Sequence, residues 1–212
     1  LLKDLPQGKW QALTVDMTKA RRPDGSGGPL AEDERIDDIQ FYVEEGAEVS
    51  VDDVALYEPA RNGEKEPFPR RFIFTGWFDT GKQGEGHEWP GDFGIVLHKK
   101  PLTWDAAKAV SDEKTGTPWI RVNMRGLRSL SERNRLRFRH NTSAKEIHVS
   151  LQDATSGEAW GKVVNVSKQG AWQDASVDFQ VKKGSQATDA VFRVPKGASL
   201  LVDDLLLYEP AE

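Results

Sequence analysis

The chain contains two sequence blocks twice, in the same order, and this repeat constrains its fold more than any other feature. Residues 7–16 (QGKWQALTVD) return as residues 169–178 (QGAWQDASVD), with six of ten positions identical. Residues 46–60 return as residues 197–211, with ten of fifteen positions identical. Because a repeated unit folds in the same way each time, both copies are expected to adopt one architecture.

The two copies differ in the sequence that leads into them. A long stretch, from about Phe72 to Lys168, precedes the blocks of the second copy, whereas only Leu1 to Pro6 precede those of the first. We therefore expect residues 1–60 to be the C-terminal half of a first repeat, residues 61–65 a linker, and residues 66–212 a complete repeat. On this interpretation the chain is a fragment of a longer polypeptide. Its partner would be the missing N-terminal half of the first repeat, or other copies of the chain.

Apolar and polar residues alternate with a period of two over much of the second copy. The pattern is clearest in residues 119–124, 135–139, 146–151 and 173–179. Such half-polar segments are typical of antiparallel strands that have one buried and one solvated face. Many short strands separated by turn residues predict an all-β jelly-roll sandwich. The first 60 residues would then be half of such a sandwich.

Composition and motifs exclude several classes of function. The chain has 34 acidic and 29 basic residues, and this net charge of −5 argues against nucleic-acid binding. It has no cysteine, so disulfides, thiolate metal sites and cysteine nucleophiles are absent. No apolar run is long enough to span a membrane. No zinc, nucleophile-elbow or phosphate-loop motif is present, so we expect no catalytic residues and no enzymatic activity.

The repeated blocks resemble a known family. The Gly-x-Trp-x-x-x-x-Val-Asp block and the terminal Val-Asp-Asp-x-x-Leu-Tyr-Glu-Pro block resemble the final strands of galactose-binding-like jelly rolls, the fold of many carbohydrate-binding modules of bacterial polysaccharide-degrading enzymes. The resemblance implies a noncatalytic, extracellular or cell-surface module of a larger multi-domain protein, with a polysaccharide as its partner. The alternative is a structural repeat of a surface layer, filament or adhesin, assembled by sandwich packing or strand exchange.

The resemblance also implies a structural calcium, held by an aspartate of the last strand. The matching positions are Asp203 and its counterpart Asp52. Strict alternation would place Asp203 on the same face as Leu205 and Leu207, where a carboxylate needs a compensating partner such as Ca²⁺. The other interpretation is that the carboxylate accepts backbone N–H groups or pairs with an arginine. The sequence leaves both open.

The seven tryptophans divide by their surroundings. Trp10 and Trp172 occupy equivalent repeat positions, which indicates a structural role, and we assign Trp77 and Trp104 to the core. Trp89 and Trp160 lie in Gly-containing segments that predict loops. Because sugar-binding modules stack exposed aromatic rings on pyranose rings, these two are the leading candidates for ligand binding.

The polar face of the predicted sheet is a second candidate surface. It consists of the outward positions of the alternating segments: Trp119, Arg121, Asn123, Arg135, Arg137, Arg139, His148 and Gln152. Of these, Trp119, Arg121 and His148 are the candidate ligand contacts, because guanidinium groups beside an aromatic ring suit acidic glycans. The competing interpretation is a cross-strand ladder between the arginines and the aspartates of residues 173–179.

Overall fold

The computed structural model describes residues 6–11, 13–17, 39–51, 54, 69–78, 89–98 and 104–211. The chain divides into two units, Leu1–Val49 and Ser50–Glu212. All strands of the described residues lie in the second unit, and the described residues before Pro69 form none. The expected linker, residues 61–65, lies outside the described part of the chain. No helix in the described residues is both long and apolar enough to cross a membrane.

The strands of the described residues follow one another in the order of the sequence. They are β1 (Pro69–Gly76), β2 (Gly91–Asp92), β3 (Gly94–His98), β4 (Trp104–Lys108), β5 (Val110–Ser111), β6 (Pro118–Ser129), β7 (Arg133–Thr142), β8 (Glu146–Gln152), β9 (Ala159–Asn165), β10 (Gln173–Gln180), β11 (Gln186–Arg193) and β12 (Leu200–Pro210).

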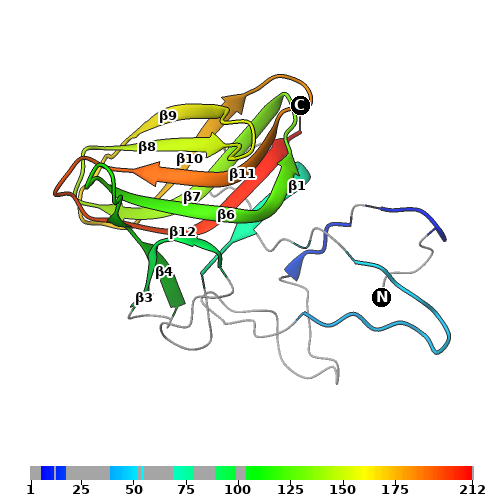
Figure 1. Ribbon diagram of the computed structural model, residues 1–212. Helices are drawn as coiled ribbons and strands as arrows, with labels where there is room; N and C mark the ends of the chain where they lie inside the picture. Colours follow the sequence, from blue (N-terminus) through cyan, green and yellow to red (C-terminus); the bar gives the residue numbers. More distant parts are fainter. Residues whose placement is uncertain are drawn as a thin grey trace. The chain divides into compact units, whose positions relative to one another are not determined.

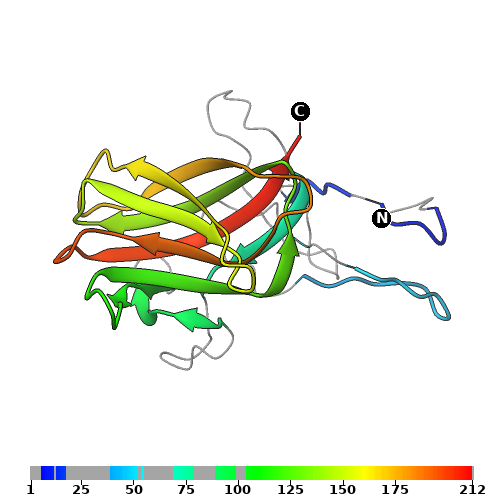
Figure 2. The same cartoon turned by 45° about the horizontal axis from the view of Figure 1, so that its top comes forward.

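The strands form two antiparallel six-stranded sheets that pack face to face (Figures 1 and 2). Sheet A has the order β10-β7-β12-β4-β3, with β1 also paired to β12. Sheet B has the order β2-β6-β11-β8-β9, with β5 paired to β6. The pairs β1·β12, β6·β11, β7·β10 and β8·β9 are nested in the sequence and alternate between the sheets. This nesting is the jelly-roll topology, and it confirms the predicted fold class for the complete copy.

The core lies between the two sheets and is built by the alternation seen in the sequence. Leu136 and Phe138 of β7, with Ile147 and Val149 of β8, are at most 2% exposed, while their neighbours in each strand face outward. The rings of Phe138 in sheet A and Phe192 in sheet B meet at 5.0 Å between centroids. Each such side chain contributes about 1.5–3 kcal/mol through burial, so the inner face of every strand ties the sheets together.

The last strand contains a β-bulge that reverses one sequence prediction. Asp203 lies opposite Arg139, but the next paired residue, Leu206, lies opposite Arg137, so β12 has two residues where β7 has one. Asp204 takes up the extra residue with a left-handed φ of 49°. Because residues directly opposite each other share a face, Asp203 lies on the outer face with Arg139. The prediction that it shares a face with the core leucines of β12 is wrong.

Candidate functional site

The charged side chains predicted to share one polar face lie on two different faces. Trp119, Arg121 and His148 lie on the outer side of sheet B, where β6 and β8 flank β11. The arginines of β7 lie on the outer side of sheet A, beside β10. The single-face prediction was wrong because alternation tells which residues of a strand share a face, but not which sheet the strand joins.

The outer face of sheet A carries the predicted arginine–aspartate ladder. Arg135 donates from Nε and Nη2 to the two carboxylate oxygens of Asp178, at 2.7 and 2.8 Å. This pairing lowers the pKa of the Asp178 carboxyl. Arg139 lies 3.3 Å from Asp204 and 3.9 Å from Asp174, and its guanidinium covers the ring of Trp172. The ladder is confirmed, and these arginines are already engaged by protein groups.

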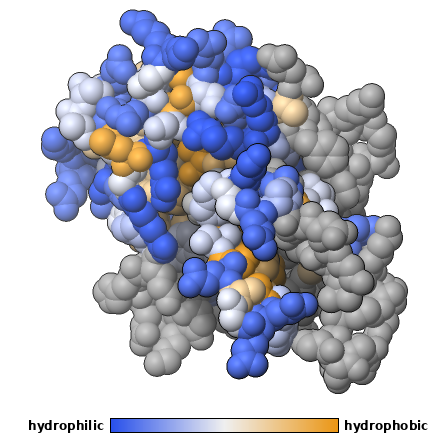
Figure 3. Space-filling view, turned by 90° about the vertical axis from the view of Figure 1, so that its right-hand side faces the viewer, coloured by the Kyte–Doolittle hydropathy of each residue, from blue (hydrophilic) through white to orange (hydrophobic). Residues whose placement is uncertain are grey.

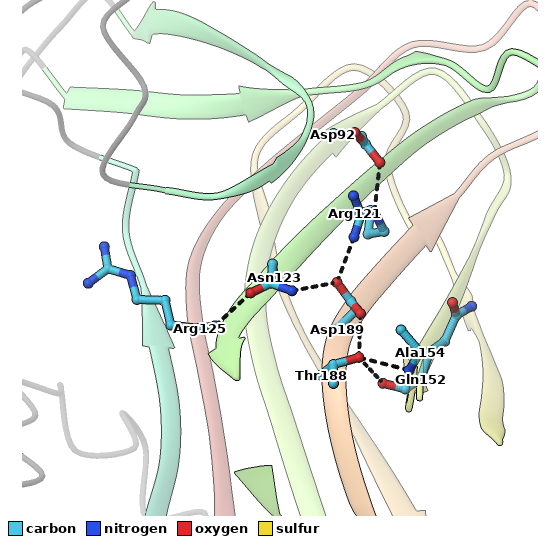
Figure 4. A network of polar contacts seen from close by, with 8 residues as sticks. All are labelled: Asp92, Arg121, Asn123, Arg125, Gln152, Ala154, Thr188 and Asp189. Atoms are coloured by element: carbon cyan, nitrogen blue, oxygen red, sulfur yellow. Dashed lines mark hydrogen bonds and ion pairs between the residues drawn. The ribbon is translucent and has the colours of Figure 1, made fainter. Parts of the chain in front are cut away.

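On sheet B, Arg121 joins three strands through carboxylates (Figure 4). Its Nε donates to Asp92 of β2 at 2.6 Å, and its Nη1 donates to Asp189 of β11 at 3.0 Å. The hydrogen bond to Asp92 is the main cause of the raised pKa of Arg121. Asp189 is 2% exposed and also accepts from Asn123 and Thr188. The structure therefore gives the predicted ligand contact Arg121 a role in holding β2, β6 and β11 together.

The other two predicted contacts on this face, Trp119 and His148, lie on either side of Arg193. All three residues form one cross-strand row, because Arg193 is paired with Trp119 of β6 and with His148 of β8. The Arg193 guanidinium lies 5.0 Å above the Trp119 ring, which is only partly exposed. His148 is exposed and its Nε2 is 3.1 Å from Glu146. We call this set the Trp119 row.

Trp160 does not lie in a loop. It belongs to β9 and is directly opposite the core residue Leu151, so its ring is partly buried against the core. The loop prediction was wrong because Gly161 interrupts the alternation that would otherwise mark this strand. Trp160 therefore presents little of its ring to a ligand.

Trp77 and Trp89 have the opposite exposures to those predicted. Trp89, the leading binding candidate, is 7% exposed and belongs to the hydrophobic core. Trp77, assigned to the core, is 49% exposed. The reason lies just after β1, where Phe78 adopts a left-handed φ of 56° and is completely buried. Phe78 takes the core position, so Trp77 is turned outward. The side chain of the other tryptophan assigned to the core, Trp104, is outside the described part.

Trp77 borders a hollow that we call the Trp77 hollow. Its volume is about 260 Å³, and it is lined by Val54 of the first repeat, by Trp77, Trp89, Arg125 and Arg128, and by the residues of β1 from Phe72 to Thr75. Trp77 meets Trp89 edge to face with ring centroids 5.0 Å apart. Among the described residues of the sandwich, Trp77 is the one tryptophan that counts as an exposed large apolar side chain. Figure 3 shows one side of the molecule, on which patches of hydrophobic residues lie between hydrophilic ones.

The arginines of the hollow are positioned by backbone contacts. The Arg125 N–H donates to Asn123 Oδ1 at 2.9 Å, and its guanidinium points away from the Arg121 network and lies 5.2 Å from the centre of the Trp89 ring (Figure 4). Arg128 Nε donates to the carbonyl oxygen of Met124 at 2.8 Å. The Arg125 guanidinium therefore lies beside Trp89, and the Arg128 guanidinium is anchored to the backbone of β6 at the same hollow.

Gly91 fixes the wall that carries Trp89. A side chain there would place its Cβ 2.0 Å from the carbonyl oxygen of Arg121, and the residue has a φ of 154° that favours glycine. The glycine lets β2 approach β6 closely, and the Asn123 N–H donates to the carbonyl oxygen of Pro90 at 2.8 Å. Trp89 directly precedes this clamped segment, which explains its fixed position.

A second depression does not have the aromatic lining of the Trp77 hollow. This shallow depression of about 520 Å³ lies between Ser143–Glu146 and Pro195–Ala198 and has no aromatic lining.

In the described part of the chain, no three histidine or acidic side chains gather where they could hold a metal ion. Asp203 is 2% exposed and accepts the Asp204 N–H at 2.8 Å, and Asp52 lies outside the described residues.

Comparisons with known proteins find similarity at the level of structure. No protein-family model matches the chain, and no curated protein matches its sequence. A variant of a family 29 carbohydrate-binding module, solved with mannohexaose, is 10% identical, with 66% of this chain and 92% of that chain covered and a TM-score of 0.45. A family 16 carbohydrate-binding module is 11% identical, with 62% and 99% covered and a TM-score of 0.39. At these identities the ligand has to be argued from this chain's own residues.

Proposed function

We propose that this protein is a noncatalytic carbohydrate-binding module and that the sugar binds in the Trp77 hollow. One observation carries the proposal: a half-exposed tryptophan packs edge to face against a buried one. A fixed aromatic face is what packs against the apolar face of a pyranose ring. Because Trp89 orders the Trp77 ring before any ligand arrives, little conformational entropy is lost on binding.

The arginines supply the polar contacts that a sugar site needs. Arg125 and Arg128 line the same hollow as the two tryptophans. Their N–H groups would donate to ring hydroxyls or to a carboxylate and so orient the sugar. We further propose that the protein acts outside the cell or on its surface, where polysaccharides are found, as one part of a larger multi-domain protein.

The test is direct titration of the protein with oligosaccharides by calorimetry. Cellulohexaose and mannohexaose are the first probes, followed by oligouronates, which engage arginines. Replacing Trp77 by alanine should weaken binding at least about fivefold, since a central aromatic contact contributes more than about 1 kcal/mol. The matched control is Trp10→Ala, which removes a tryptophan that is 73% exposed and far from this hollow in sequence. Unchanged affinity of Trp77→Ala would refute the site.

The Trp119 row provides the second arm of the same experiment. It also combines a tryptophan with an arginine and a histidine, although Arg193 covers part of the ring. If Arg193→Ala, and not Trp77→Ala, abolishes binding, the carbohydrate function stands and the site moves to the outer face of sheet B. If no oligosaccharide binds, the carbohydrate function itself is wrong.

The structural-repeat function remains the second candidate. The observation in its favour is the exposure of large apolar residues in the described part of the first repeat, such as Phe41 and Trp10. Carbohydrate binding does not explain these residues.

A further inference from the structure

The first repeat already contains the turns of the second. Gly8 and its counterpart Gly170 have φ angles of 69° and 71°, and Gly46 and its counterpart Gly197 have 82° and 86°. The turn hydrogen bond from the Ala198 N–H to the carbonyl oxygen of Pro195, 3.1 Å long, has an equivalent in the first copy. There the Ala47 N–H donates to the carbonyl oxygen of Glu44 at 3.0 Å. Local sequence thus produces the same turns in both copies.

The segments between those turns differ in exposure between the two copies. The apolar residues that should face a core are open in the first copy: Val15, Ile39, Phe41, Val43 and Val51 are 44–56% exposed. The residues at the same positions of the second copy are 0–9% exposed. Phe192, the equivalent of Phe41, is completely buried and touches Phe138. The first copy therefore has the sequence and turns of a back half, with its inner face uncovered.

The second copy shows what covers this face. The two repeated blocks of the second copy contain β10 and β12. These two strands lie on either side of β7 and pair with it. The strand between the blocks, β11, lies between β6 and β8. Every strand neighbour of the back half in these pairings belongs to the front half, residues 69–165. A strand lacking these neighbours has unpaired backbone groups and an apolar face in water.

We propose that the described residues of the first repeat, 7–11, 13–17 and 39–51, belong to a docking surface for a jelly-roll front half of the same kind as β1 to β9, which completes a second sandwich. The occupant is a further front-half repeat and not a second copy of this chain. The front half within residues 69–165 already pairs with its own back half, β10 to β12, so it is not free to cover a second one. This inference does not depend on carbohydrate binding.

The test supplies the front half and measures amide hydrogen exchange in the full chain. A duplicate of residues 66–168 is joined ahead of Leu1, and exchange is compared with that of the original chain. We expect exchange at residues 39–51 to slow by at least about a hundredfold, as expected for amides that enter a stable sheet. The strands from Pro69 to Pro210 serve as the internal standard for folding.

The control joins the same duplicate with aspartate at the positions that copy Leu136 and Phe138. These two core substitutions should abolish the protection of residues 39–51 while leaving the original sandwich protected. If the unmodified duplicate gives no protection, the inference is refuted. It is also refuted if the original chain alone protects these residues, whether at all concentrations or only as concentration rises, because the first repeat would then close on itself or on a second copy.

Discussion

The rings of Trp77 and Trp89 meet edge to face at 5.0 Å, yet one residue is half exposed and the other is buried. The difference follows from Phe78, whose left-handed backbone lets its own ring enter the core and turns Trp77 outward. Trp89 therefore supports the hollow from the core, and Trp77 presents its ring to solvent. The two residues should differ in stability and in binding when each is replaced.

We expect Trp89→Ala to destabilise the protein by about 3–5 kcal/mol, because it removes a large buried ring and leaves a cavity. Trp77→Ala should cost less than about 1.5 kcal/mol, since its ring is half in solvent and loses mainly the contact with Trp89. Urea unfolding of both variants measures the difference. Equal costs would mean that Trp77 is a core residue after all.

Arg121 and Arg135 give a second comparison. Both pair with aspartates, but Asp189 beside Arg121 is 2% exposed, whereas Asp178 beside Arg135 is 54% exposed. Arg121→Met leaves a buried carboxylate with only neutral partners and should cost about 2 kcal/mol. Arg135→Met should cost less than about 1 kcal/mol, since exposed ion pairs contribute little. A larger loss for Arg135→Met in urea unfolding would contradict this ranking.

The bulge of β12 predicts an unusual preference at Asp204. Its φ of 49° is costly for a residue with a Cβ. Asp204→Gly should therefore stay within about 0.5 kcal/mol of the natural protein, while Asp204→Val should lose about 1–2 kcal/mol. Asp174→Ala is the control, because it removes the other carboxylate near Arg139 without touching the bulge. Thermal unfolding distinguishes the variants, and a stable Asp204→Val would show that the bulge is unstrained.

His140 should make the stability depend on pH. It is 2% exposed, and burial lowers its pKa below the ordinary 6.5 despite the opposing charge of Asp174. The unfolded chain then binds a proton at a pH where the folded protein does not. The contribution of His140 to the free energy of unfolding is therefore fully present above pH 6.5. It is lost as the pH drops toward the folded pKa, by at most about 1.4 kcal/mol per pH unit.

Urea unfolding at a series of pH values between about 7.5 and 5.5 measures how the free energy of unfolding changes with pH. The slope cannot exceed the value for uptake of one proton. His140→Leu should flatten it, because this substitution removes the buried imidazole. If the slope persists in His140→Leu, another group is responsible.

Much of the fold could be predicted from local sequence, because alternation in a strand reports directly on which side faces a core. Leu136, Phe138, Ile147 and Val149 are buried as their pattern indicated. The arginine–aspartate ladder between β7 and β10 was also predictable, since both strands carry complementary charges at alternate positions. The assignment failed where a strand changes phase, as at Asp204, or where a residue beyond a strand end adopts a left-handed conformation, as at Phe78.

The candidate site was predicted less well, for a related reason. Exposure of a tryptophan depends on which of two adjacent residues enters the core, and that choice at Trp77 and Phe78 was made by packing against Trp89 and Phe93. The arginines of the hollow, Arg125 and Arg128, lie at the end of β6, where strict alternation had already stopped. A left-handed Arg125 gives no signal that periodicity could reveal.

By itself, the sequence determined the repeat, the strand periods, the turns and the absence of thiol chemistry, because each depends on residues close together in the chain or on composition alone. Only the tertiary structure decided how strands divide between the two sheets, which face Asp203 joins and which tryptophan reaches solvent. Those outcomes depend on contacts between residues far apart in sequence. In the described part of the first repeat, the same apolar pattern and the same glycine turns occur without strands, since a sheet needs neighbours that local sequence does not supply.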